Sequence, residues 1–172
     1  MRLTYATLGA FIKYPWTSAP SISGDRPKSN KYGVFQSELR IFEEISEAIG
    51  VTKRGDHWYS RHPLVYLMEA ADDFCYALLD LEDGLEMGIL KWDQVFEIIE
   101  PCLKKQDAAI LRDSLDKYSL GRRPSLVRGK IIETYINSAA KAFIQNEELF
   151  LQGFEKDLIS HCDDEVRNSV NK

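Results

Sequence analysis

A row of three polar side chains at one spacing is the feature of this sequence best suited to chemistry. Asp72, Tyr76 and Asp80 follow one another at intervals of four residues. Because an α-helix turns by about 100° per residue, this spacing sets all three along one side of a helix. Carboxylates on an apolar helix must meet water, a cation or a ligand rich in hydrogen-bond donors. A solvated acidic face is the simpler interpretation, and a cation or ligand site is the alternative.

The row lies in residues 62–83, whose apolar pattern predicts one helix of about six turns. Ser60 is a possible N-cap, Pro63 suits the first turn and Gly84 is a natural end. A broad apolar stripe at helical spacing runs along this helix: Leu67, Ala70, Ala71, Phe74, Leu78 and Leu81. Burial of this stripe would hold the polar row in place.

The rest of the chain also has the spacing of helices, and the sequence lacks sustained alternation with period two. We therefore predict an all-α fold in a single helical domain over residues 1–172. Further helices are expected at residues 3–11, 38–49, 92–103, 108–118, 126–146 and 150–159, with a connector at 51–61. Residues 17–31 predict a flexible loop, because they are rich in proline, glycine and serine, and residues 161–172 predict a polar tail.

Composition narrows the class of protein. A chain of 172 residues with 44% hydrophobic residues can bury a core, and a net charge of −5 makes nucleic acid an unexpected partner. The three cysteines are widely spaced and form no pair typical of a zinc site or a disulfide framework, which favours a reducing, cytoplasmic compartment. No apolar run is long enough to cross a membrane, and no secretory leader opens the chain, so no membrane partner is expected.

Two further groups of residues stand out in the sequence. Lys13 and Tyr14 precede Pro15, which ends the first helix, and packed aromatic residues at a helix end are the simpler interpretation. The one dense basic cluster of the sequence consists of Arg122, Arg123, Arg128 and Lys130. These cations are either solvated residues around a helix N-terminus or phosphate contacts, since guanidinium groups and helix N-termini both bind phosphate oxygens.

Three stretches resemble the deoxyguanosine triphosphate triphosphohydrolases, a family of HD-domain metal-dependent phosphohydrolases. The longest runs from Arg61-His62-Pro63-Leu64 through Glu69-Ala70-Ala71-Asp72-Asp73 to Tyr76 and Leu81-Glu82-Asp83. The others are Leu3 to Leu8 with Lys13-Tyr14-Pro15, and Lys31 to Glu38. The resemblance extends from about residue 3 to residue 143 and covers the C-terminal half of the family's catalytic module. It implies an HD-domain-like helical bundle that is incomplete at its N-terminus.

The resemblance also implies roles for residues. Enzymes of this family bind a divalent metal, Mg²⁺ or Mn²⁺, through a histidine, a His-Asp dipeptide and a distant aspartate, which Asp72 matches. Tyr76 and Asp80 match residues that line the sugar and phosphate pocket, whereas Lys13 and Tyr14 match residues that face the phosphates. The looser candidates for phosphate contacts are Arg128, Lys130, Arg122 and Arg123.

No His-Asp dipeptide occurs in the chain, because its three histidines, His57, His62 and His161, precede Trp58, Pro63 and Cys162. The metal site is incomplete here, so the chain is a fragment, a truncated gene product or a partner subunit. The implied activity is hydrolysis of a deoxynucleoside triphosphate to a deoxynucleoside and inorganic triphosphate, with this chain inactive alone and the protein a homo-oligomer. Two other classes stay open: a non-catalytic helical module for interaction or assembly, and a nucleotide-binding regulatory module.

Overall fold

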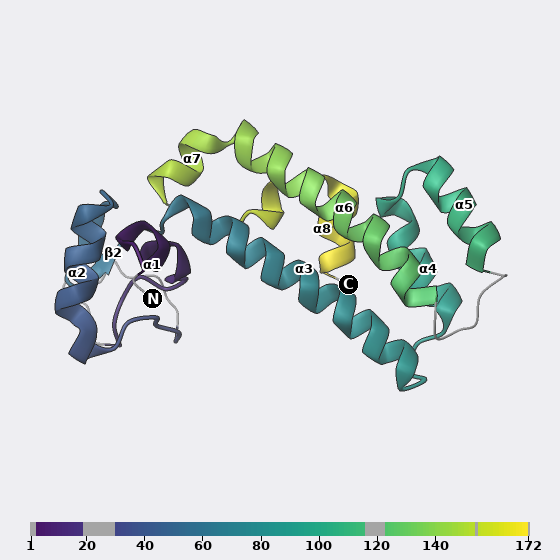
Figure 1. Cartoon of the computed structure of the whole chain (residues 1–172), viewed down its shortest axis with the longest axis horizontal. Helices are drawn as coiled ribbons and strands as arrows, with labels where there is room; N and C mark the ends of the chain where they lie inside the picture. The colour runs from purple at the N-terminus through teal and green to yellow at the C-terminus, as the bar shows by residue number, and fades with distance from the viewer. Residues whose placement is uncertain (1–2, 19–29, 116–122, 154, 172) are drawn as a thin grey trace. The chain divides into compact units, whose positions relative to one another are not determined.

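The structure of the chain is a computed structural model, and it describes residues 3–18, 30–115, 123–153 and 155–171. Figure 1 shows that helices make up most of these ranges and that the strands are confined to one short hairpin. The prediction of an all-α fold is therefore confirmed. No helix in the described ranges is long and apolar enough to cross a membrane. The predicted loop at residues 17–31 lies for the most part outside the described residues.

The chain divides into two compact units, where the sequence predicts a single domain. The first unit consists of residues 1–69 and 146–157, and the second consists of residues 70–145 and 158–172. Helix α3 (Pro63–Glu86) contributes its first turns to the first unit and the rest of its length to the second. Each unit has buried aromatic residues of its own, so each is described by itself.

The first unit contains five further elements: α1 (Tyr5–Phe11), α2 (Leu39–Ala48), β1 (Lys53–Gly55), β2 (Trp58–Tyr59) and α7 (Glu147–Gln152). A short 3-10 turn, η1 (Gln36–Glu38), precedes α2. The two strands pair antiparallel within the predicted connector, and they are too short to produce a period-two signal in the sequence. The ring of Tyr59 packs edge-on against Phe42, with ring centroids 5.3 Å apart, and Tyr66 packs against Phe150 at 4.9 Å. The first pair packs the hairpin against α2, and the second packs α3 against α7.

The second unit contains the rest of α3 together with α4 (Trp92–Ile99), α5 (Lys105–Leu115), α6 (Arg123–Gln145) and α8 (Asp164–Val170). Two 3-10 turns, η2 (Glu100–Cys102) and η4 (Ile159–His161), connect them. The ring of Phe74 on α3 lies 4.5 Å from the ring of Tyr135 on α6. The Tyr135 hydroxyl lies 2.8 Å from the Ser169 hydroxyl on α8, and burial raises the pKa of Tyr135 to about 12. Tyr135 therefore links three helices.

Both ends of α3 differ from the prediction. His62 caps the N-terminus, because its Nδ1 accepts a hydrogen bond from the Leu64 N–H at 3.2 Å. Ser60, the predicted cap, instead accepts a bond from the Thr52 N–H at 3.0 Å. Gly84 lies inside the helix, where an added Cβ would come within 2.7 Å of the Leu90 side chain. The helix stops only after Glu86, since the next turn folds back and its amides bond to the Gly84 carbonyl.

The C-terminal region also differs from the prediction of a helix at 150–159 and a polar tail at 161–172. Helix α7 ends one residue before Gly153, which has a left-handed backbone with φ of 69°. The residues after His161 form α8, and its Val166 and Ser169 are buried. A helix this short is stable only through tertiary packing. The apolar pattern of so few residues does not predict such a helix.

Candidate functional site

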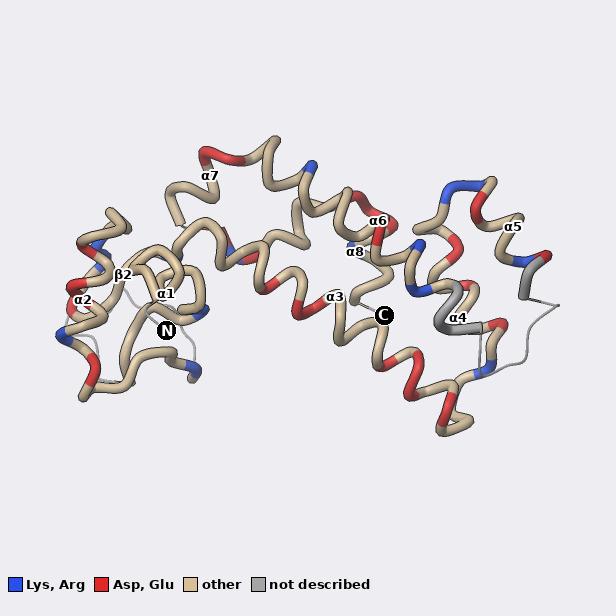
Figure 2. The backbone as a smooth tube through the Cα atoms, viewed as in Figure 1, with Lys and Arg blue, Asp and Glu red and all other residues tan. Residues whose placement is uncertain are grey.

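Asp72, Tyr76 and Asp80 all lie on the exposed side of α3. Figure 2 shows acidic residues recurring along this helix. Tyr76 is 62% exposed, and the two aspartates are exposed as well. No hydrogen bond or ion pair joins any of the three to another residue that the structure describes. Asp73, the next residue on the helix, is half-buried and has a partner within the chain. The row is thus a line of unpaired polar groups that face solvent.

The donors in the described part of the chain do not fit a complete divalent metal centre. No group of three or more histidine, cysteine, aspartate or glutamate side chains is close enough to hold a metal ion in the described part of the chain. Stable sites for divalent metals in proteins use several such ligands. The nearest histidine in the sequence, His62, uses its Nδ1 to cap α3, and the Nδ1 of His57 lies 3.3 Å from Glu43. Asp72 therefore offers one carboxylate and no more.

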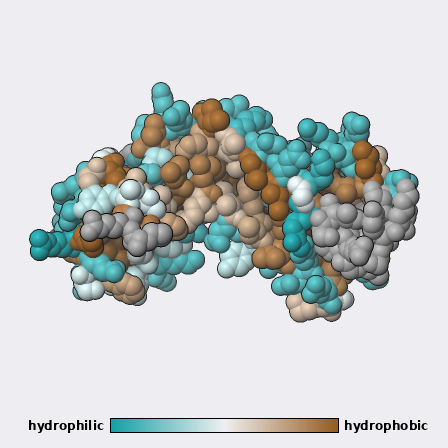
Figure 3. Space-filling model, viewed as in Figure 1, coloured by the Kyte–Doolittle hydropathy of each residue, from teal (hydrophilic) through white to brown (hydrophobic). Residues whose placement is uncertain are grey.

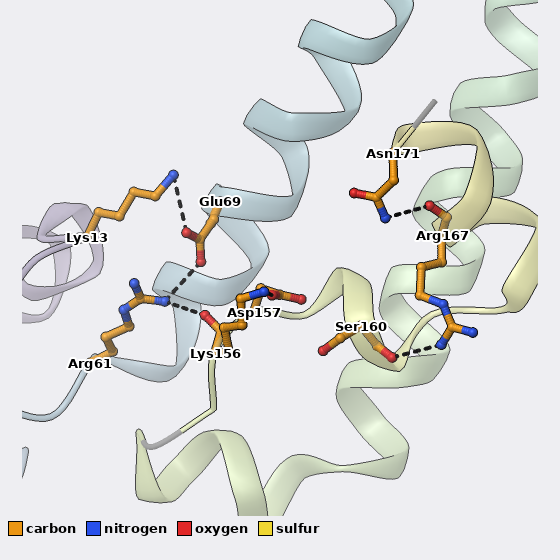
Figure 4. A network of polar contacts seen from close by, with 8 residues as sticks. All are labelled: Lys13, Arg61, Glu69, Lys156, Asp157, Ser160, Arg167 and Asn171. Atoms are coloured by element: carbon orange, nitrogen blue, oxygen red, sulfur yellow. Dashed lines mark hydrogen bonds and ion pairs between the residues drawn. The ribbon is translucent and has the colours of Figure 1, made fainter. Parts of the chain in front are cut away.

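Lys13 belongs to a buried ionic cluster in the first unit. Figure 4 shows its ammonium and the Arg61 guanidinium converging on Glu69, at 3.2 Å and 3.0 Å. Glu69 is only 8% exposed, and Arg61 also donates to the Lys156 carbonyl at 2.9 Å. In the sequence, Glu69 lies close to the line of the polar row, yet its side chain is buried where Lys13 and Arg61 contact it. The cluster ties the end of α1, the start of α3 and the segment after α7 together.

Tyr14 lies between two lysines. The Lys13 and Lys31 ammonium groups are 6.0 Å and 5.9 Å from the centroid of its ring, within the range of a cation–π contact. Residues 31–33 reach this ring because the Gly33 N–H donates to the Tyr14 carbonyl at 3.0 Å, where a Cβ on Gly33 would be only 2.7 Å from that oxygen. Lys31 was not predicted as a site residue. Its position in a locally basic stretch, residues 28–31, is the sequence feature that could have identified Lys31.

The basic cluster is only partly placed, and its placed members are paired. Arg128 makes two hydrogen bonds to Glu82, at 2.8 Å and 2.6 Å. The Lys130 ammonium lies 3.3 Å from Glu133 and 3.7 Å from Asp107, and the hydrogen bond to Glu133 raises the pKa of Lys130. Arg122 and the side chain of Arg123 lie outside the described residues. Lys13 and Tyr14 belong to the first unit, whereas Arg128, Lys130 and the polar row belong to the second.

Comparison with known proteins gives relatives over nearly the whole chain, although no family model matches it. A "deoxyguanosinetriphosphate triphosphohydrolase-like protein" of Pseudomonas aeruginosa is 43% identical over 161 residues, which is 93% of this chain and 36% of that protein. Proteins of the same name from Synechocystis sp. and Listeria monocytogenes are each 35% identical, over 92% and 89% of this chain and 36% and 33% of theirs. The chain thus spans about a third of the length of these relatives. The family resemblance seen in the sequence is confirmed.

Proposed function

Since this chain is related over nearly its whole length to the deoxyguanosinetriphosphate triphosphohydrolase-like proteins, we propose that it forms part of a deoxynucleoside triphosphate triphosphohydrolase. The reaction releases a deoxynucleoside and inorganic triphosphate. The observation that carries this proposal is the 43% identity over 161 residues to the Pseudomonas aeruginosa protein. The unpaired row on α3 supports it, because an exposed row of carboxylates without partners is free to meet a ligand.

In this proposal Asp72 supplies one carboxylate to a divalent metal, Mg²⁺ or Mn²⁺, whose other ligands are not in this chain. Tyr76 and Asp80 then lie about 6 Å and about 12 Å further along α3, at about 1.5 Å of rise per residue. A deoxynucleoside triphosphate bound at Asp72 by its phosphates would extend its sugar over such distances. Tyr76 would pack against the deoxyribose, where a 2′-hydroxyl would be excluded, and Asp80 would accept a hydrogen bond from the sugar.

Within the second unit, the phosphate chain would be held by Arg128, whose side chain is 47% exposed while it pairs with Glu82. Exposed pairs of this kind contribute only about 0–1 kcal/mol, so the arginine can leave the carboxylate. Lys13, in the first unit, is a separate candidate for a phosphate contact, since its side chain keeps 27% exposure while it contacts Glu69. A phosphate offers Arg128 the same two-pronged geometry that the carboxylate gives it now.

The isolated chain is expected to be inactive, because one carboxylate and water cannot hold a metal in a fixed geometry. Incubation with dGTP and Mn²⁺, followed by detection of triphosphate, should show no turnover. A rate on the order of 1 per second or more, an ordinary enzyme rate, would contradict the proposal that other residues complete the site.

A chimera tests the function itself. This chain replaces the matching third of the Pseudomonas aeruginosa relative, once that parent has been shown to hydrolyse a deoxynucleoside triphosphate. The chimera should retain the activity, and Asp72→Ala in it should abolish turnover while the matched Asp73→Ala variant is far milder. A folded chimera without activity would favour a non-catalytic helical or regulatory module, and equal losses in both variants would show that Asp72 does not have the proposed role.

The proposal also concerns location and assembly. All three cysteines are free thiols, and Cys75 is exposed, which suits the reducing cytoplasm where nucleotide pools are used. Figure 3 shows hydrophobic residues exposed on parts of the viewed face. Exposed apolar residues of the second unit on α3 and α6 include Tyr76, Leu79, Ile132, Ile136 and Ile144. We infer from this surface that the protein assembles, either with copies of itself or with the remainder of a longer protein.

A further inference from the structure

Helix α6, which lies within the second unit, carries an apolar stripe on its exposed side. The members of the stripe recur at intervals of four residues, which sets them in one line along the helix: Ile132, Ile136, Ala140 and Ile144. The three isoleucines are 37%, 58% and 71% exposed, and Ala140 is exposed as well. A single exposed isoleucine on a protein surface is ordinary. Three in one line on one helix indicate that a partner covers them.

A polar border accompanies the stripe on its solvent side. Glu133, Asn137 and Lys141 each follow a stripe residue by one position, so they form a second line about 100° further around the helix. All three are exposed. On the other side of the stripe the neighbouring line is buried: Ile131, Tyr135 and Ala139. The border therefore runs from an acid through an amide to a base along the helix.

The stripe is complementary to itself when the helix is reversed. A two-fold axis at the level of residue 138 sets each residue opposite the one that lies equally far on the other side of this level. Ile132 then meets Ile144 of the copy, and Ile136 meets the small side chain of Ala140. A parallel pair would instead set Ala140 against Ala140 and leave a gap, whereas contacts between helices are close-packed. The sizes of the stripe residues thus favour an antiparallel pair.

The charges of the border favour the same arrangement. A two-fold axis that crosses both helices puts the two borders on one side, where Glu133 lies about 3 Å along the axis from the level of Lys141 of the copy. Asn137 lies beside Asn137 of the copy, and an amide can both donate and accept. Within the chain, Lys141 pairs with Asp163 at 2.9 Å and Glu133 with Lys130 at 3.3 Å. Both pairs are largely exposed and contribute little stability, so they leave the border able to meet a copy.

We infer that α6 pairs antiparallel with α6 of a second copy of this chain, with the apolar stripes in contact. The pairing narrows the assembly proposed above to one partner and one surface. It does not depend on the proposed activity, because no residue of the stripe or its border has a role in that activity. A single pair of helices is smaller than the standard interface of about 1,600 Å², so the association should be weak and should depend on concentration.

Sedimentation of the 172-residue chain from about 1 μM to about 1 mM, the range of weak complexes, tests the pairing. A dimer should form as the concentration rises, and Ile136→Lys should weaken it by at least about tenfold, because its charge would be buried in the stripe. Glu133→Lys and Lys141→Glu should each weaken the dimer, and the double variant should restore it. Within one chain the double reversal leaves like charges beside Lys130 and Asp163, so only a contact between copies explains its restoration.

Cysteine cross-linking tests the direction of the pair, in a Cys75→Ser background that removes the exposed thiol. Asn137→Cys should form a disulfide between copies under oxidation, because this position lies next to the two-fold axis. Ile144→Cys is the matched control, since the antiparallel pair separates its two thiols by about 18 Å along the axis while a parallel pair brings them together.

The substituted residues are exposed, so circular dichroism should show the same helix content in every variant. A monomer at every concentration would overturn the inference and leave the stripe to a partner other than a copy. A dimer that Ile136→Lys does not weaken would overturn it as well, because the contact would then lie on another surface. Cross-linking through Ile144→Cys and not through Asn137→Cys would overturn the antiparallel arrangement.

Discussion

Gly153 is the position where one added methyl group should do the most damage to the first unit. Its backbone is left-handed, with φ of 69°, and a Cβ built there would lie 2.6 Å from the Arg61 carbonyl oxygen and 2.8 Å from the Ser60 Cβ. The atoms it meets are backbone atoms or a Cβ, so no side-chain rotation can relieve the contacts. Gly153→Ala should therefore push the segment after α7 away from Ser60 and Arg61.

The expected loss has two parts. A non-glycine residue in the left-handed region costs about 1–2 kcal/mol. Overpacking against atoms that cannot rotate away adds about 1–3 kcal/mol. The sum, about 2–5 kcal/mol, is a large fraction of the 5–15 kcal/mol by which a typical domain is stable. The bond from the Tyr66 hydroxyl to the Glu155 carbonyl, at 3.1 Å, should be lost with the shift of the segment.

Urea unfolding followed by tryptophan fluorescence measures this loss, in a Trp92→Phe background so that the signal comes from Trp16 and Trp58 in the first unit. Gly50→Ala is the matched control, because Gly50 has φ of 74° in the same unit but nothing lies within 4 Å of an added Cβ. Gly50→Ala should cost only the backbone part. If the two variants lose the same free energy of unfolding, the close approach at Gly153 does not constrain the fold.

Three other predictions concern the whole chain. Burial lowers the pKa of His62, and its Nδ1 must stay unprotonated to cap α3. The contribution of His62 to the free energy of unfolding should therefore be fully present above pH 6.5 and decrease as the pH falls below it. Thermal melts check the assignment, because the His62→Asn variant should lack this decrease. Burial raises the pKa values of Tyr66 and Tyr135 to about 12, so stability should fall between pH 10 and about 12, and absorbance titration at alkaline pH should show both groups ionising late. Light scattering should show an assembly larger than the monomer, and Ile136→Lys should weaken it; a monomer at all concentrations would refute the exposed-surface argument.

The local features of this chain could be read from its sequence because they depend on periodicity. The position of α3 and the side of it that carries Asp72, Tyr76 and Asp80 follow from a repeat of 3.6 residues. The same reasoning placed Phe74 and Leu78 on the buried side, and both are buried. Ala71, assigned to the same stripe, is exposed, because a stripe drawn from hydrophobicity alone is wider than the side of the helix that is buried.

The features that could not be predicted depend on particular side-chain contacts and not on the helical repeat. Gly84 looks like a helix end, yet its lack of a side chain serves close packing by Leu90, which no local pattern reports. The tail after His161 looks polar, yet Val166 is buried in the second unit. Lys31 reaches the ring of Tyr14 through a backbone bond that Gly33 makes, at a separation of more than fifteen residues.

The ionic cluster around Glu69 bears on the proposed role of Lys13 as a phosphate contact. Glu69 is 8% exposed, and leaving a buried carboxylate without a partner is costly. If Lys13 alone neutralised Glu69, its departure to a phosphate would strand that charge. Arg61, however, also contacts Glu69, at 3.0 Å, and is itself held by the Lys156 carbonyl. In the proposed function, Lys13 would therefore exchange Glu69 for a phosphate while the buried carboxylate kept a guanidinium, and Arg61 would be the residue that makes Lys13 available.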